Sequence, residues 1–154
     1  MKAISLWQPW ASALFALRED GTPIKPDETR HWPLPEKYLG VEVAIHAALR
    51  DTPEQRDFWL EQVIRGPWAP INQRAFESLG ISDYYELPRG QIVGKVVFDR
   101  CRETTGQANE PEIAREWGIY SPGRYAWRTS KRTAFAEPIV CTGRQGFFNW
   151  EPPV

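Results

Sequence analysis

The stretch QIVGKVVFDRC (Gln91–Cys101) carries the strongest strand signal in the sequence. β-Branched and aromatic residues dominate it, and the turn sequence LPRG comes directly before it, as is typical of a strand that follows a tight turn. Gly94 interrupts the apolar run, and a glycine inside a strand predicts a bulge or a close approach of another part of the chain. We therefore expect a fold that is organised around β-structure.

Shorter strands are predicted on both sides of this segment, because short apolar or alternating runs are bounded there by turn residues. These runs are KAISL (2–6), VEVAIHAAL (41–49), the segment after YSPG (from 124) and EPIVCTG (137–143). Caps, apolar spacing and glycine stops predict helices at 9–21, 52–65, 73–80 and 110–118. Together these elements predict an α+β fold built on a small β-barrel with flanking helices. We expect a single domain over residues 1–154, with a helical insertion at about 51–88.

Composition excludes several classes of protein. No apolar run is long enough to cross a bilayer and the N-terminus lacks the pattern of a signal peptide, so we expect a cytoplasmic protein with no membrane partner. Cys101 and Cys141 are too few for a disulfide framework or a four-cysteine zinc site. With two histidines, no Cys-x-x-Cys pair and no phosphate-binding glycine motif, we expect neither a metal nor a cofactor.

Charge is distributed unevenly along the chain, although the net charge is only −1. The segment 51–88 is acidic, whereas residues 124–150 carry five basic residues against Glu137 alone. Arginine accounts for 14 of the 19 basic residues, and its planar group suits phosphates and base edges. The sequence also has eight tryptophans, which serve either as core packing or as stacking platforms for bases.

The stretch KPDETR (25–30) gathers charged residues between prolines, which stiffen the loop. If the chain is extended here, Glu28 and Arg30 share a face while Thr29 points away. Lys25 would act as a base or bind a phosphate, Glu28 would accept hydrogen bonds from a base edge, and Arg30 would bind phosphate or brace Glu28. The alternative is structural: the same three residues would form salt bridges in a loop that packs a helix against the barrel.

Six motifs occur in an order that resembles the ASCH domain family, which has a PUA-like β-barrel fold. They are LWQPWASAL (6–14), KPDETR (25–30), AIHAA (44–48), LPRGQIVGKV (87–96), YSPGRYAW (120–127) and GRQGFFNW (143–150). The resemblance covers nearly the whole chain except residues 51–88. It implies a cleft between the first helix and the barrel, beside residues 25–30, and an association with RNA or DNA.

The charged signature of the family is a glycine followed by Lys-x-x-Glu-x-Arg. Lys25, Glu28 and Arg30 match its charged positions, whereas Gly21 lies further upstream than the signature places its glycine. A smaller branch of the family hydrolyses the amide of acetylated cytidine with a lysine and a threonine in this loop. Glu28 stands where that branch has its threonine, so the sequence departs from the amidase pattern at the nucleophile.

Three further places supply candidate binding residues. Arg124 and Tyr125 follow a tight turn, where arginine would bind phosphate and tyrosine would stack on a base. Trp7 and Gln8 lie at a strand-to-helix turn that favours anions, and the glutamine amide would contact a base. His46 lies in a strand among alanines. The alternative roles of these residues are structural. Trp7 and Tyr125 would pack in the core, Arg124 would lie at the rim of the barrel, and His46 would be held by hydrogen bonds.

These residues lead to three functional hypotheses. The first is a module that binds single-stranded RNA, DNA or a modified nucleotide in a cleft lined by Lys25, Glu28 and Arg30, with the basic C-terminal third on the backbone. The second is a hydrolase acting on a modified nucleoside or on RNA, with Lys25 as base, Glu28 activating water and Arg30 stabilising negative charge. The third is a protein-interaction domain that uses the acidic helical insertion.

Overall fold

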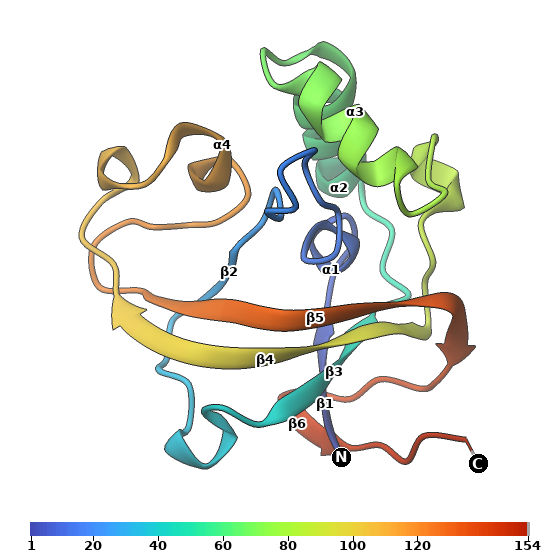
Figure 1. Cartoon of the computed structure of the whole chain (residues 1–154), viewed down its shortest axis with the longest axis vertical. Coiled ribbons are helices and arrows are strands. Elements are labelled where there is room, and N and C mark those ends of the chain that lie inside the picture. The colour runs from blue at the N-terminus through green and yellow to red at the C-terminus, as the bar shows by residue number, and fades with distance from the viewer. Residues whose placement is uncertain (154) are drawn as a thin grey trace.

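Six strands form one mixed sheet that curls into a half-barrel (Figure 1). The structure is a computed structural model and describes residues 1–153. The strands follow the order β2-β5-β4-β3-β1-β6, with bounds β1 Lys2–Leu6, β2 Asp27–Arg30, β3 Glu42–Ala47, β4 Gln91–Glu103, β5 Tyr125–Val140 and β6 Phe147–Asn149. Neighbouring strands are antiparallel except β1 and β3, which are parallel. The fold is therefore α+β, with β2 and β6 at the two edges of the sheet.

β4 confirms the strand predicted at Gln91–Cys101. Its pairing register with β5 shifts on the N-terminal side of Gly94, which is the predicted bulge. A Cβ atom on Gly94 would lie 2.5 Å from the carbonyl oxygen of Thr133 and 2.7 Å from the ring of Phe15. The close approach that a glycine inside a strand predicts is therefore confirmed as well.

β5 joins two segments that the sequence patterns predict as separate strands. It runs without a break from Tyr125 to Val140, alongside β4 (Figure 1). The pairing with β4 passes from Ile139 directly to Ala134, so residues 135–138 have no partner on β4. The proline at 138 therefore lies where the ladder needs no N–H donor, and the strand tolerates it.

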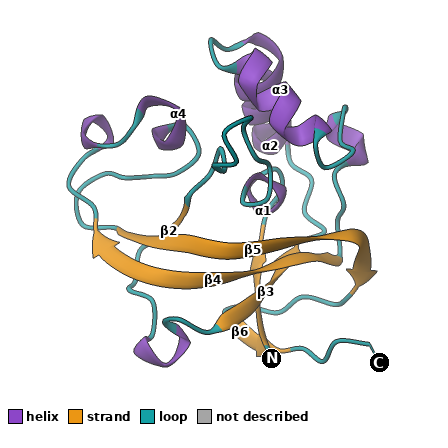
Figure 2. Cartoon of the chain, in the orientation of Figure 1, coloured by secondary structure: helices purple, strands orange, loops and turns teal. Residues whose placement is uncertain are grey.

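The described residues form four short α-helices, all on one side of β4 and β5 (Figure 2). They are α1 Trp10–Ala13, α2 Pro53–Trp59, α3 Ala69–Glu77 and α4 Glu112–Arg115, with a π-helix Leu60–Arg65 after α2 and 3-10 helices at Glu36–Tyr38, Tyr84–Glu86 and Gln107–Asn109. The predicted capping box is present, because Thr52 Oγ1 accepts from Gln55 N–H and the Gln55 side chain accepts from Thr52 N–H. No helix within residues 1–153 is long and apolar enough to cross a membrane.

α1 is much shorter than the helix predicted at 9–21, because the chain turns back on itself soon after Ala13. The N–H of Arg18 donates to the carbonyl of Thr22 at 2.7 Å, and the N–H of Ile24 donates to the carbonyl of Ala16 at 3.0 Å. These bonds replace a continued helix with a tight return. The return brings residues 22–24, which lead into β2 and its charged stretch, back against residues 16–18 just after α1.

Candidate functional site

Two adjoining cavities share Ser5, Trp7 and Arg30. One is lined by residues of α1, α2 and the sheet, and the other by the ends of β3 and β5, the start of β4 and the loop before β6. The first, about 770 Å³, has Trp10, Phe58 and Trp117 in its wall together with Lys25, Glu28 and Arg124; we call it the aromatic chamber. The second, about 870 Å³, is lined by Arg89, Arg144, His46 and residues 140–146; we call it the arginine chamber. The chambers adjoin at these three residues, and we call the two chambers together the cleft.

Lys25, Glu28 and Arg30 form an ion triad in the wall of this cleft. Lys25 Nζ lies 2.7 Å from Glu28 Oε1, and Arg30 Nε lies 2.9 Å from Glu28 Oε2. Glu28 and Arg30 share a face of β2, whereas Thr29 points away and accepts a hydrogen bond from the N–H of Ile119 at 3.0 Å. The expectation that these neighbours alternate sides is therefore confirmed.

The charge state of the triad follows from its burial and its partners. Burial of the Glu28 carboxyl raises its pKa, but the nearby charges of Lys25 and Arg30 outweigh that effect, so the net pKa lies below the ordinary value. Lys25, only 2% exposed, donates both to Glu28 and to the carbonyl of Asp27 at 2.8 Å. Proton abstraction by this lysine would first require the ion pair to open.

This lowered pKa gives a testable pH dependence. Because the folded state holds Glu28 ionised more strongly than the unfolded chain does, its contribution to stability is present above the unfolded pKa and is lost as the pH falls through the folded value. We therefore expect the free energy of unfolding to fall more steeply in the natural protein than in Glu28→Gln as the pH drops below about 5. Urea unfolding at a series of pH values measures both slopes, and parallel curves would contradict the assignment.

Trp7 lies at the junction of the chambers with a cation on its ring. Its side chain is 45% exposed, and the guanidinium of Arg50 lies 4.8 Å from the ring centre. Arg30 also borders both chambers, and its Nη2 lies 3.3 Å from the carbonyl oxygen of Ser5. An exposed indole beside a cation is suited to stacking on a base.

His46 contributes to the arginine chamber as a neutral, fixed ring. Its Nε2 lies 2.7 Å from the carbonyl oxygen of Cys141, which can only accept, so this nitrogen carries the proton. Nδ1 then accepts from the hydroxyl of Ser5 at 2.9 Å. Burial lowers the pKa of His46 by more than the hydrogen bond to the carbonyl of Cys141 raises it. Gly143 packs on this pair so closely that a Cβ atom would lie 2.7 Å from Ser5 Oγ.

The remaining candidate residues divide between the cleft and the interior. Arg124 lines the aromatic chamber and contacts the ring of His31 at 3.0 Å. Gln8 is fully buried: its Nε2 donates to the Ser12 hydroxyl at 2.7 Å, and its Oε1 accepts from Ser12 N–H. Tyr125 lines neither chamber and packs against the core cluster around Trp127. The structure therefore brings Trp7, Arg124 and the ion triad together, but not Gln8 or Tyr125.

Several residues of the cleft were not singled out from the sequence as site residues. Arg89 lies in the turn sequence LPRG, and Arg144 is one of the five basic residues of 124–150, but no sequence pattern marks either of them as a site residue. Trp10, Phe58 and Trp117 come from three distant segments and meet edge to face or tilted, with ring centres 4.6 and 5.1 Å apart. These three rings come together only in the folded chain, so no local sequence pattern predicts the aromatic wall.

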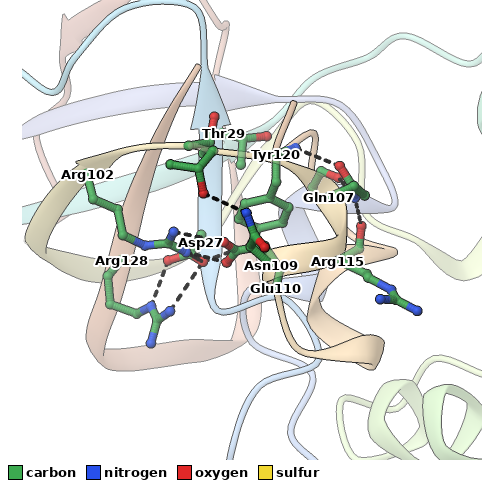
Figure 3. Close-up of polar contacts among 12 residues, drawn as sticks. Asp27, Thr29, Arg102, Gln107, Asn109, Glu110, Arg115, Tyr120 and Arg128 are labelled. Carbon is green, nitrogen blue, oxygen red and sulfur yellow. Dashed lines mark hydrogen bonds and ion pairs between the residues drawn. The ribbon is translucent and has the colours of Figure 1, made fainter. Parts of the chain in front are cut away.

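A buried network beside the triad anchors the start of β2. Asp27, only 1% exposed, accepts from Arg128 Nε at 2.7 Å, Tyr120 Oη at 2.8 Å and Arg102 Nη2 at 3.4 Å (Figure 3). Arg102 also pairs with both carboxylate oxygens of Glu110. The network ties β2 to β4, β5 and the segment after α4, and so fixes the position of the triad.

No protein-family model and no curated protein sequence matches this chain. Within residues 1–153, no group of three or more His, Cys, Asp or Glu side chains is placed to hold a metal ion. The cleft presents arginines, an aromatic wall and the ion triad.

Proposed function

We propose that this protein is an ASCH-type domain with a PUA-like fold, and that it binds single-stranded RNA or a modified nucleotide in the cleft. The observation that carries the proposal is that the aromatic and arginine chambers adjoin at Trp7 and Arg30. A strand of nucleic acid needs aromatic faces for its bases and cations for its phosphates, side by side. The half-barrel with helices on one side is compatible with the proposed family.

The charges of the arginine chamber support an anionic ligand. None of the described residues that line it is an aspartate or a glutamate. Arg89 and Arg144 have no carboxylate within ion-pair distance among residues 1–153, whereas Arg30 is only partly neutralised by a glutamate that it shares with Lys25. Cations without local partners attract phosphates and release counterions when they bind them.

The geometry favours binding over hydrolysis by the triad. Both carboxylate oxygens of Glu28 already accept hydrogen bonds, and Lys25 donates two. A general base needs a free lone pair within reach of the substrate. In the observed arrangement the triad holds Arg30 in place at the junction of the chambers, which is what a binding site requires.

Fluorescence anisotropy tests the proposal with labelled single-stranded RNA, single-stranded DNA and duplex of matched sequence. We expect single strands to bind more tightly than duplex, with an affinity that falls as salt rises. Arg89→Gln and Arg144→Gln should each weaken binding and reduce the salt slope by about 1.

The matched control is Arg65→Gln, because Arg65 is an exposed arginine in the acidic helical segment, with Glu61 at 4.0 Å. It removes the same charge away from the cleft, so its salt slope should equal that of the natural protein. The absence of binding to any nucleic acid at low salt would contradict the proposed function.

A further inference from the structure

We infer that the cleft holds a nucleotide in one orientation, with its base in the aromatic chamber and its phosphate in the arginine chamber. The inference rests on the proposed function and adds to it a direction and a class of ligand. It also assigns Trp117 as the residue that donates a hydrogen bond to the base.

The aromatic chamber has the character of a base pocket. Trp10 and Phe58 are partly exposed and their ring centres lie 4.6 Å apart, while Phe58 meets Trp117 edge to face at 5.1 Å. The chamber is also lined by the cations Lys25, Arg30 and Arg124, and by two carboxylates, Glu28 and Glu116. Flat aromatic walls beside carboxylates favour a planar heterocycle over a phosphate.

Trp117 supplies the second observation. Its side chain is 1% exposed, it lines the aromatic chamber, and its Nε1–H has no hydrogen-bond acceptor among the residues that the structure describes. A buried indole normally finds a partner for this group, because an unmet buried donor is costly. A ligand that carries an acceptor into the chamber would meet that requirement, and a nucleobase edge carries several.

The arginine chamber has the features of a phosphate-binding site. Arg89 is held over the ring of Tyr84 at 4.7 Å, but its hydrogen bonds to the carbonyls of Arg50 and Leu87 are long, at 3.4 Å each. Its Nη2 is buried and has no acceptor within residues 1–153. A guanidinium positioned by stacking, with a donor left over, is suited to a phosphate oxygen.

The junction of the two chambers determines where the sugar of the ligand would lie, between its base and its phosphate. Trp7, Ser5 and Arg30 border both chambers, so a sugar that joins base and phosphate would lie against them. The reverse orientation would put a phosphate among aromatic rings and beside Glu28 and Glu116, and would leave Arg89 and Arg144 without an anion. Desolvating a phosphate against apolar rings costs far more than placing a base there.

Calorimetric titration with thymidine, thymidine 5′-monophosphate and thymidine 3′-monophosphate tests the orientation. We expect at least one monophosphate to bind about tenfold or more tightly than the nucleoside. Arg89→Gln should remove most of that gain while leaving thymidine affinity unchanged, and Arg65→Gln should leave both values unchanged. If neither phosphate improves binding while RNA still binds in the anisotropy assay, the orientation is wrong and the proposed function stands.

The role of Trp117 is tested with the difluorotoluene analogue of the same nucleotide, which keeps the shape of thymine but is a very poor hydrogen-bond acceptor. The natural protein should prefer the thymine compound by about five- to tenfold. Trp117→Phe should reduce that preference, with thermal unfolding as a check on its fold. Equal affinity of the natural protein for the two compounds would overturn the assignment, whatever the behaviour of the variant.

Discussion

Asp27→Ala is expected to lower the free energy of unfolding by about 2–4 kcal/mol. Asp27 is 1% exposed and accepts hydrogen bonds from Arg128, Tyr120 and Arg102. Without the carboxylate, the buried Tyr120 hydroxyl loses its acceptor, while Arg128 can turn to solvent and Arg102 keeps Glu110. The loss of stability should therefore be large, but smaller than the loss that follows when a buried charge has no partner at all. Urea unfolding at neutral pH measures it.

Two further variants provide reference values for this loss of stability. Asp99→Ala removes an exposed aspartate that has no ion pair among the described residues, and should change stability by less than about 0.5 kcal/mol. Tyr120→Phe removes only the hydroxyl and should cost about 1 kcal/mol. If Asp27→Ala costs no more than Asp99→Ala, the network does not hold β2 in place.

The local parts of the fold could be predicted from the sequence. The strand at Gln91–Cys101, its bulge at Gly94 and the capping box at Thr52 depend on neighbouring residues, and the structure has all three. The length of α1 and the continuity of β5 could not be predicted, because contacts between distant segments decide them. The return of the chain onto Ala16 ends the helix, and pairing with β4 carries β5 past its proline.

The same distinction applies to the candidate site. The spacing of Glu28 and Arg30 shows that they share a face of an extended strand, and they do. Nothing local shows that Gln8 turns inward to accept from the N–H of Ser12 in the first turn of α1. Nor does any local pattern show that Arg89 faces the same cleft as Arg144, because the two are brought together by β4 and by the loop before β6.

Glu28→Gln is expected to have a larger effect on stability than Asp27→Ala, a loss of about 3–5 kcal/mol. The substitution leaves the ammonium of Lys25, which is 2% exposed, without a carboxylate. A buried charge that loses its only counter-ion is far more costly than an exposed one. Glu61→Gln is the control, since Glu61 pairs with Arg65 on the surface at 4.0 Å, and it should cost less than about 1 kcal/mol.

The double variant Lys25→Met/Glu28→Gln separates the structural role of the triad from its role in binding. Replacing both charges removes the orphaned ammonium, so we expect most of the lost stability to return. Arg30 would still lack the carboxylate that holds its Nε at 2.9 Å, and its guanidinium would no longer be fixed at the junction of the chambers. Single-stranded RNA should therefore bind the stable double variant about fivefold or more weakly than the natural protein. Natural affinity in a double variant of restored stability would show that the triad only clamps β2, and that Arg30 needs no carboxylate to bind its ligand.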